Sequence, residues 1–310
     1  MPVKDRREQM LRCLDALLAQ DHPSYQILVL DNESSDGTGE ACRKRAAGAN
    51  VPLRVERIAG TLGAVRNRAA ELAGTEFLAF TDSDCLPSPG WLRAGVAALR
   101  ADPGLGVVCG KTLPQEPPTQ GWPATIEVTS WTGRFEGCNL IFRTGALRDS
   151  GGFDGEVGHY WEDTAAGYAL LRTGWRAAFA PEALVHHDVT YLGFWWHVGR
   201  ARKNKHLGPV LERYPEIRRD LLIGGVFLHP RDPKLVAALA GAALALRRPG
   251  GLLLALPYVA ERLRRWHDPK GLVQTVIYDT VSLASTLEAT LPTLFGRSRG
   301  VATGGGCCQP

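Results

Sequence analysis

Hydrophobic and polar positions alternate in blocks along the first half of the chain. Residues 6–19 place Met10, Leu14 and Leu17 on one helical face, and Ile27–Leu30 form a short apolar run typical of a buried strand. The order repeats, with helices expected at 40–47, 64–73 and 90–101 and strands at 53–58, 77–80 and 105–109. This alternation predicts an α/β fold with a mostly parallel sheet flanked by helices. Ligands in such folds bind outside the carboxyl ends of the strands.

The second half of the chain is less regular. Residues 111–129 are rich in proline and are expected to form a long loop. A strand at 138–142, a turn at 150–154, a helix at 162–173 and a short strand at 177–180 follow. Beyond about residue 225 come apolar segments broken by arginines. We therefore expect an α/β domain over 1–225, a helical region over 226–298 and a flexible tail over 299–310.

Composition narrows the class of protein. The 310 residues include 36 Lys and Arg against 32 Asp and Glu, a net charge of +4, and 45% are hydrophobic. These values exclude a disordered or collagen-like chain, and without a concentrated basic stripe they give no sign of a nucleic-acid partner. The seven cysteines form no C-x-x-C pair and no zinc spacing, so we expect a protein of the reducing cytosol.

Targeting segments are not evident in the sequence. The first residues have no apolar core, so we expect no secretory leader. The longest apolar run, Leu235–Leu246, has 12 residues, whereas a transmembrane helix needs about 20. We expect a cytoplasmic protein, with peripheral attachment to the inner face of the membrane as an open alternative.

Two carboxylates directly follow the apolar strand expected at 77–80. Asp82 and Asp84 are separated by one residue and lie where ligands bind in an α/β fold. Hard oxygen ligands at this place suit Mg²⁺ or Mn²⁺ bridging a diphosphate. The plainer interpretation is a solvated turn or a helix cap near Pro87–Trp91.

Other strand ends also carry polar residues. Asp31 follows the strand at 27–30 and could recognise a nucleobase, although an Asx-rich turn is the plainer interpretation.

Gly37-Thr38-Gly39 resembles the start of a dinucleotide-binding loop, but the third glycine of that motif is missing and the loop lies too far from the strand. A nicotinamide-dependent dehydrogenase is therefore disfavoured.

Two further acids and two histidines complete the candidate chemistry. Glu162 and Asp163 begin an expected helix, where they either complement the helix dipole or supply a general base. His186 and His187 follow Pro181, after the strand expected at 177–180. They are either surface residues or a source of one metal ligand.

The motifs, taken in order, resemble those of family 2 glycosyltransferases with a GT-A fold, over about residues 1–190. The residues that carry this resemblance are Pro2-Val3-Lys4-Asp5, Leu30–Thr38, Gly63 with Arg66-Asn67, Thr81-Asp82-Ser83-Asp84, Gly151–Asp154, Glu162-Asp163 and His187.

The resemblance implies an inverting transfer from a nucleotide-diphosphate sugar, with Mn²⁺ or Mg²⁺ as cofactor. It implies that Asp84 binds the metal, Asp82 lies near ribose and metal, and His187 adds a ligand. It implies further that Asp31 meets the nucleobase and that Asp163 is the catalytic base. Pro2, Val3, Asp5 and Arg66 are expected to line the donor pocket.

Three features depart from the family pattern. The family begins with a complete strand before its Pro-Val motif, whereas Met1 here immediately precedes Pro2, which suggests that the true start lies upstream. The Q-x-x-R-W motif of processive members is absent, which argues against a polymer-extending synthase. The acid that follows Glu162-Asp163 in many relatives is replaced by Thr164-Ala165-Ala166.

The last third combines basic and apolar residues. Residues 199–219 hold seven basic residues against two acids, beside Phe194, Trp195 and Trp196. The apolar stretches 235–246 and 252–260 fit two short helices at an anionic membrane surface. A hydrophobic helical pair packed on the catalytic domain or on a second subunit fits equally well.

The leading hypothesis is a metal-dependent, inverting, nonprocessive glycosyltransferase acting on a glycan or lipid-linked acceptor. A transferase that loads a sugar onto polyprenyl phosphate is an alternative, for which Arg200, Arg202 and Lys203 would bind the phosphate. A catalytically silent module that only binds nucleotide sugars is the other alternative.

Overall fold

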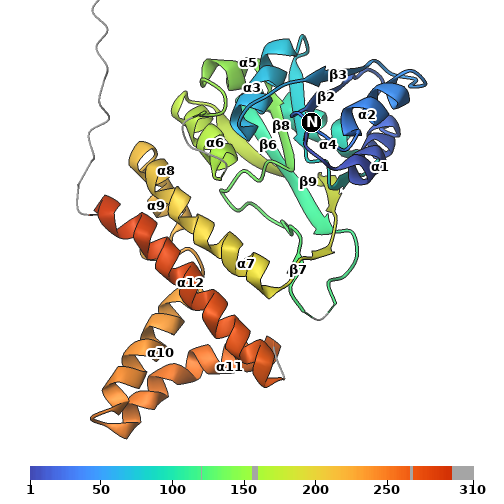
Figure 1. Ribbon diagram of the computed structural model, residues 1–310. Helices are drawn as coiled ribbons and strands as arrows, with labels where there is room; N and C mark the ends of the chain where they lie inside the picture. The colour runs from blue at the N-terminus through green and yellow to red at the C-terminus, as the bar shows by residue number, and fades with distance from the viewer. Residues whose placement is uncertain (120, 156–159, 266–267, 295–310) are drawn as a thin grey trace, which may run out of the picture. The chain divides into compact units, whose positions relative to one another are not determined.

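A computed structural model describes residues 1–119, 121–155, 160–265 and 268–294 (Figure 1). The chain forms two compact units, one of residues 1–197 and one beginning at Val198, and each is described separately below.

The first unit opens with a three-stranded parallel sheet. Its order is β1-β2-β3, with strands Pro2–Val3, Ile27–Asp31 and Leu53–Arg57. The connecting helices are α1 (Arg7–Leu18), α2 (Thr38–Ala46) and α3 (Leu62–Leu72). Val3 pairs with Asp31, so the loops that follow β1 and β2 leave the sheet side by side.

The second sheet of this unit has five strands in the order β4-β8-β6-β9-β5. The strands are β4 (Phe77–Thr81), β5 (Cys85–Pro87), β6 (Leu105–Pro114), β8 (Asn139–Arg143) and β9 (Arg176–His187). The helices are α4 (Trp91–Ala101), α5 (Thr144–Asp149) and α6 (Glu162–Arg172). A separate pair joins β7 (Pro123–Ala124) to β10 (Thr190–Tyr191).

The α/β class and the C-terminal helical region are confirmed, but the strand directions differ in part from the expected mostly parallel sheet. The first sheet is parallel, whereas in the second β8 runs antiparallel to both β4 and β6. The cause is the long excursion after β6, which returns the chain to the sheet in the opposite direction.

Strand β9 continues past Pro181, where the sequence predicted an end at residue 180. Its register against β6 shifts between the pairs Gly110–Ala180 and Thr112–Val185. Pro181 lies in this irregular segment, where no ladder hydrogen bond from its nitrogen is required. His187 is therefore held within a strand rather than in a following loop.

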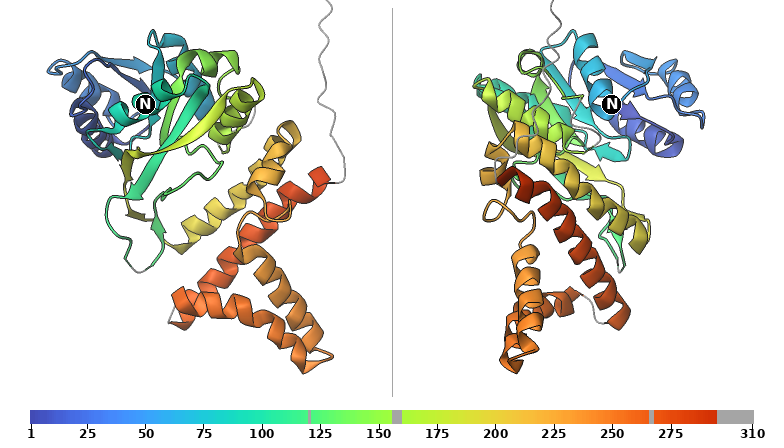
Figure 2. Two further views of the ribbon diagram at one scale, coloured as in Figure 1. Left: turned by 180° about the vertical axis from the view of Figure 1, so that it is seen from behind. Right: turned by 60° about the vertical axis from the view of Figure 1, so that its left-hand side comes forward.

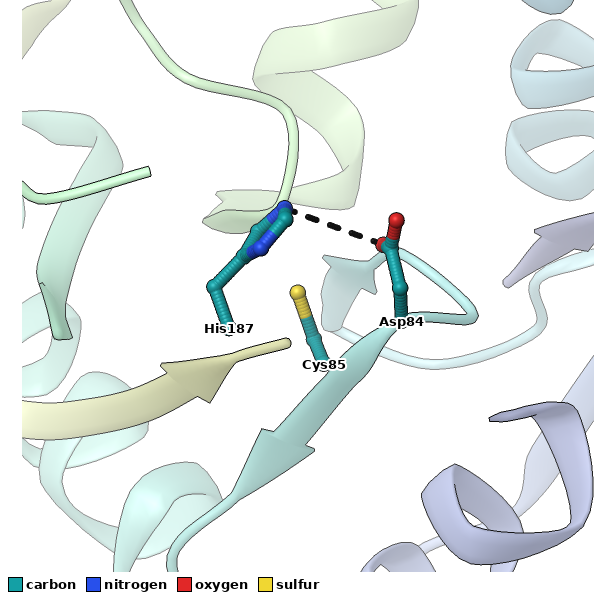
Figure 3. Close-up of side chains that lie close together, drawn as sticks. All are labelled: Asp84, Cys85 and His187. Carbon is teal, nitrogen blue, oxygen red and sulfur yellow. Dashed lines mark ion pairs between the residues drawn. The ribbon is translucent and has the colours of Figure 1, made fainter. Parts of the chain in front are cut away.

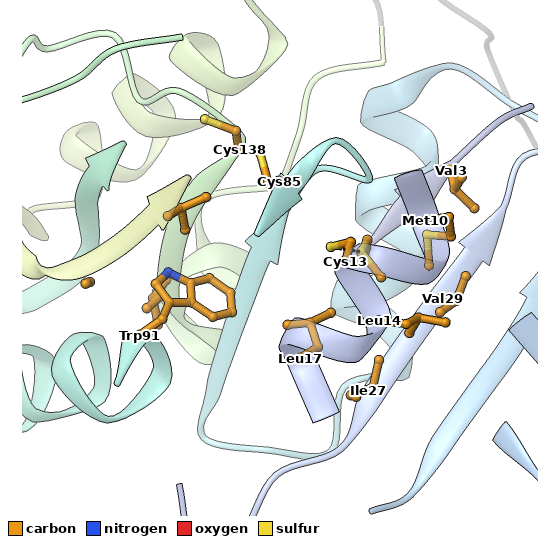
Figure 4. Packing of buried hydrophobic residues seen from close by; sticks show 14 of the residues in the cluster. Val3, Met10, Cys13, Leu14, Leu17, Ile27, Val29, Cys85, Trp91 and Cys138 are labelled. Carbon is orange, nitrogen blue, oxygen red and sulfur yellow. Dashed lines mark hydrogen bonds between the residues drawn. The ribbon is translucent and has the colours of Figure 1, made fainter. Parts of the chain in front are cut away.

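The core of the first unit packs α1 and α4 against the strands (Figure 4). Trp91 is buried, and its indole nitrogen donates to Asn139 Oδ1 at 2.8 Å. The amide nitrogen of Asn139 donates to the carbonyls of Lys111 and Ala183, each at 2.9 Å. The buried side chain of Asn139 therefore links α4, β6 and β9 to one another.

The second unit is helical. Helix α7 (Phe194–Ala201) spans the division and is followed by η1 (Arg202–His206), α8 (Leu207–Arg213), α9 (Glu216–Leu221), α10 (Arg231–Ala245), η2 (Pro249–Ala255), α11 (Leu256–Arg265) and α12 (Pro269–Leu294). The apolar stretches at 235–246 and 252–260 are helical as expected, although the second begins as a 3₁₀ turn. The 26-residue helix α12 was not predicted.

The domain boundary expected at residue 225 stays a prediction, and the tail expected at 299–310 lies outside the described residues. Among the helices that the structure describes, none is both long enough and apolar enough to cross a bilayer.

Candidate active site

The paired strands β5 and β9 of the first unit bring Asp84 beside His187. Cys85 on β5 pairs with His187 on β9, and the Asp188 amide donates to the Asp84 carbonyl at 2.9 Å. The Asp84 Oδ1 and His187 Nε2 atoms lie 3.8 Å apart, as the dashed line in Figure 3 shows. Two of the three side chains that the sequence predicted as metal ligands, Asp84 and His187, therefore meet.

The orientation of His187 is set by its own backbone neighbour. The ring Nδ1 lies 2.8 Å from the Asp188 carbonyl oxygen, which can only accept a hydrogen bond. Nδ1 must therefore carry the proton, and in a neutral ring Nε2 presents a lone pair toward Asp84. Such support of the second ring nitrogen is characteristic of metal-binding histidines.

The composition of this cluster fits a hard divalent cation. Ligand atoms of Asp84, Cys85 and His187 all lie within 4.8 Å of one another. Hydrogen bonding with Cys138 and burial raise the pKa of the Cys85 thiol well above its usual value, which favours the neutral thiol. The usable donors are then a carboxylate and an imidazole, which together with solvent and phosphate oxygens suit Mn²⁺.

Arg6 is a neighbour of Asp84 that sequence reasoning missed. Its guanidinium lies 2.5 Å from Asp84 Oδ2, and the Arg6 side chain is 45% exposed. No pattern in the sequence signals this ion pair, because 78 residues separate the partners. The half-exposed Arg6 therefore places a positive charge beside Asp84.

Asp31 lies at the end of β2 in a tightly packed position. Its side chain is buried, and its Oδ1 accepts a hydrogen bond from the Ser34 amide at 2.9 Å. A Cβ on Gly39 would lie 2.1 Å from Asp31 Oδ2, so only glycine leaves room for this carboxylate. The loop and helix therefore hold Asp31 in one orientation.

Asp5 joins the loop after β1 to the loop after β2. Its backbone is left-handed, with φ of 49°, a conformation that side chains rarely adopt outside functional loops. Its Oδ1 accepts from the Ser35 amide at 2.7 Å, and this hydrogen bond lowers the pKa of Asp5. Pro2 and Val3 pair with Leu30 and Asp31, so they lie behind this pair of loops.

Arg66 connects two motifs that are far apart in the sequence. It is buried, and its two terminal nitrogens lie 3.3 Å from Asp82 Oδ1 and 2.7 Å from Glu162 Oε1. Its guanidinium also lies 5.5 Å from the centre of the Phe153 ring. A single cation is therefore shared between the acid after β4 and the first acid of α6.

The start of α6 holds two carboxyls with perturbed pKa values. Burial, together with the negative charge of Asp163, raises the pKa of Glu162 to about 7, and Arg66 opposes the rise. Burial also raises the pKa of Asp163, against the positive charge of Arg66 and hydrogen bonds from two backbone amides. Those amides are Gly137 at 2.8 Å and Thr164 at 2.7 Å.

The backbone before these acids is strained. Trp161, which precedes α6, has φ of 72°, and the Arg134 guanidinium lies 5.7 Å from the centre of its ring. Strain of this kind persists where the surrounding structure requires it and is frequent at active sites.

The structure groups the predicted residues into three neighbouring sets. Asp84 lies with His187, Asp82 lies with Arg66 and Glu162, and Asp31 lies with the loop that Asp5 holds. Asp82 is outside the Asp84–Cys85–His187 cluster, so its role as a metal ligand stays a prediction. Glu162 and Arg66 form an ion pair that the motif spacing did not reveal.

The sequence model of Glycosyl transferase family 2 matches residues 1–160, which is just over half of the chain. The chain therefore belongs to glycosyl transferase family 2, as the sequence motifs implied.

Curated relatives agree with this assignment. The chain is 30% identical over 190 residues to Glycosyltransferase AglE of Haloferax volcanii, a match covering 55% of this chain and 62% of the relative. It is 26% identical over 245 residues to the pre-mycofactocin glycosyltransferase of Mycobacterium tuberculosis, covering 73% and 49%. It is 28% identical over 217 residues to an N-acetylglucosaminyl-diphospho-decaprenol L-rhamnosyltransferase of the same species, covering 57% and 70%. For the first two relatives the match spans less than two thirds of their length.

Solved structures confirm the GT-A fold. The mannosyltransferase PcManGT of Pyrobaculum calidifontis, solved with GDP-Man and Mn²⁺, aligns with a TM-score of 0.57 at 21% identity. The alignment covers 96% of this chain and 86% of that one. The S. aureus TarS fragment 1–349, solved with UDP, aligns with a TM-score of 0.51 at 18% identity, covering 92% and 88%.

Proposed function

We propose that this protein is a metal-dependent, inverting, nonprocessive glycosyltransferase. It moves a sugar from a nucleotide-diphosphate donor to a hydroxyl of a glycan or lipid-linked acceptor. The observation that carries the proposal is Arg66, which lies between Asp82 on the donor side and Glu162, the neighbour of the expected base.

Asp163 is the proposed general base. Its raised pKa makes it a stronger proton acceptor than an ordinary carboxylate, and two backbone amides hold its orientation. It removes the proton of the acceptor hydroxyl while that oxygen bonds to the anomeric carbon. The bond from that carbon to the diphosphate oxygen breaks in the same displacement, so the configuration inverts.

The donor side is assigned by its chemistry. Asp31 accepts hydrogen bonds from the nucleobase, and Asp82 accepts them from the ribose. Asp84 and His187 would hold Mn²⁺ or Mg²⁺, which supplies positive charge against the departing diphosphate. Pro2, Val3 and Asp5 support the nucleotide through the paired loops after β1 and β2.

The acceptor class rests on the relatives, since one is named as acting on a decaprenol-diphosphate-linked sugar. The processive motif is absent from this sequence, which supports transfer of single sugars. Hydrolysis of a donor without an acceptor identifies the sugar and the nucleobase.

Acceptor-free hydrolysis of a donor tests the proposal directly. The purified chain is incubated with a panel of UDP-, GDP- and dTDP-sugars and Mn²⁺, and the released nucleoside diphosphate is measured. We expect slow hydrolysis of one donor, abolished by Asp84→Ala and by chelation. Asp163→Asn is expected to retain donor binding but to hydrolyse the donor at least about a hundredfold more slowly, because the amide cannot take a proton from the attacking water.

Asp149→Ala is the matched control, because this exposed acid lies on α5, away from the three residue sets. Hydrolysis that is equally fast in wild type and Asp84→Ala would contradict the metal assignment. Absence of both hydrolysis and metal-dependent nucleotide binding would leave a catalytically silent module.

A further inference from the structure

Helices α10, α11 and α12 of the second unit bury small and polar side chains beside a small apolar cluster of Leu235, Tyr258 and Leu283. Helix α12 buries Thr275, Asp279, Ser282 and Thr286, while Val273, at 59% exposure, faces outward. Asn204 donates to the hydroxyls of Ser282 and Thr286, at 3.2 and 3.3 Å. Small and polar residues thus make the contacts between helices, as they do in proteins whose helices pack within lipid.

The polar interior centres on a buried carboxylate. Asp279 is 1% exposed and accepts a hydrogen bond from the Tyr258 hydroxyl at 2.9 Å. Arg231 lies 2.8 Å from one of its oxygens and Arg262 lies 3.6 Å from the other. These contacts fix α10, α11 and α12 to one another in the triangle that Figures 1 and 2 show, without a large apolar core.

A close backbone contact joins α10 and η2. A Cβ on Gly241 of α10 would lie 2.5 Å from the Gly251 carbonyl oxygen of η2. In the other direction, a Cβ on Gly251 would lie 2.7 Å from the Gly241 carbonyl oxygen. The Cβ atoms of Leu254 and Leu244 flank this contact, so the two segments leave little room for larger side chains between them. Most leucines of the two segments are exposed, whereas Leu235 is buried.

The result is an apolar surface with a basic margin on the hairpin of α10, η2 and α11, residues 231–265. Its most exposed leucines are Leu246 at 89%, Leu253 at 67%, and Leu252 and Leu256 at 57% each. The charged residues classed as exposed between residues 239 and 264 are Arg247, Arg248 and Arg264. Glu261 in the same stretch is neutralised by Lys234 at 2.6 Å and by Arg262.

We propose that the hairpin of residues 231–265 docks onto the surface of an anionic lipid bilayer, with its leucines inserted and its arginines at the headgroups. Three observations favour this occupant over a protein: the polar contacts between the helices, the exposed leucines on both arms and the turn, and the exposed arginines Arg247, Arg248 and Arg264. Helix α10 has 15 residues, about 22 Å of helix, which suits lying at the interface rather than crossing it.

This proposal stands on the second unit alone and does not depend on the proposed transferase activity. The full chain is sedimented with vesicles of phosphatidylcholine, with and without phosphatidylglycerol, at low and high salt. We expect binding to the anionic vesicles, weaker binding to neutral ones, and release by salt.

Two double variants test the apolar and the electrostatic contributions to vesicle binding separately. Leu252→Ser/Leu253→Ser is expected to lower vesicle affinity at least about tenfold, because exposed leucines lose their apolar contact with lipid. Arg247→Ala/Arg248→Ala is expected to lower it roughly thirtyfold on anionic vesicles, with little change on neutral ones. Leu192→Ser and Arg43→Ala/Lys44→Ala are the matched controls, since these exposed residues lie in the first unit.

Circular dichroism verifies that each variant keeps its helix content. Failure of the full chain to bind anionic vesicles would overturn the proposal, as would binding that the leucine variant leaves unchanged. A vesicle-free dimer that dissociates in Leu252→Ser/Leu253→Ser would assign the surface to a second copy and overturn the proposal too.

Discussion

Replacing Glu162 by glutamine should change how the stability of the protein depends on pH. Burial raises the pKa of Glu162 from 4.5 to about 7, so the folded protein binds its proton more tightly than the unfolded chain. The neutral carboxyl stabilises the folded state fully below pH 4.5, and this advantage is lost as the pH rises through 7. The total is about 3 kcal/mol, of which about 2 kcal/mol falls between pH 5.5 and 8.

Urea unfolding of wild type and Glu162→Gln at several pH values measures this effect. Glutamine has the shape of the protonated acid and still accepts a hydrogen bond from Arg66, so the two proteins should be similarly stable at pH 5.5. At pH 8 the variant should have gained about 2 kcal/mol relative to wild type, since it avoids the buried negative charge.

Glu71→Gln is the control, because this carboxyl is exposed on α3 and pairs with Arg68. Its unfolding free energy should follow that of wild type at every pH. Parallel curves for wild type and Glu162→Gln across pH 5.5–8 would refute the raised pKa.

Three further changes test the site. Arg66→Met removes the cation that lowers the pKa of Asp163, so the pH optimum of transfer should rise by roughly one unit; unfolding free energy should also fall by about 3–5 kcal/mol in urea titrations. Gly39→Ala places a Cβ against Asp31, so calorimetry should show nucleotide affinity about tenfold weaker with Mn²⁺ affinity unchanged. Asp84→Ala should weaken Mn²⁺ binding about tenfold or more, which the paramagnetic resonance of free Mn²⁺ reports; unaltered binding would exclude Asp84 as a ligand.

The strand ends could be predicted from the sequence because short-range periodicity defines them. Apolar runs located β2 and β4 within one residue, and this placed Asp31 and Asp82 at the edge of the sheet. The direction of β8 could not be predicted in this way, because strand pairing depends on how the long excursion after β6 returns.

The candidate site shows the same limit. The motifs named Asp84 and His187, but the hydrogen bond that orients His187 comes from a backbone carbonyl, which no side-chain pattern records. The strand that carries His187 extends past Pro181 only because β6 and β9 share a register shift. Contacts between distant residues, such as Arg6 with Asp84, depend on the folded chain and leave no local signal.

The shared guanidinium of Arg66 has a consequence for how this site can evolve. Because one buried cation balances Asp82 and Glu162 together, neutralising either acid leaves the other with the whole charge. The effects of substitutions at the two positions should then be non-additive, although 80 residues separate them in the sequence. Lineages in which Asp82 is replaced are therefore expected to acquire compensating changes at the start of α6.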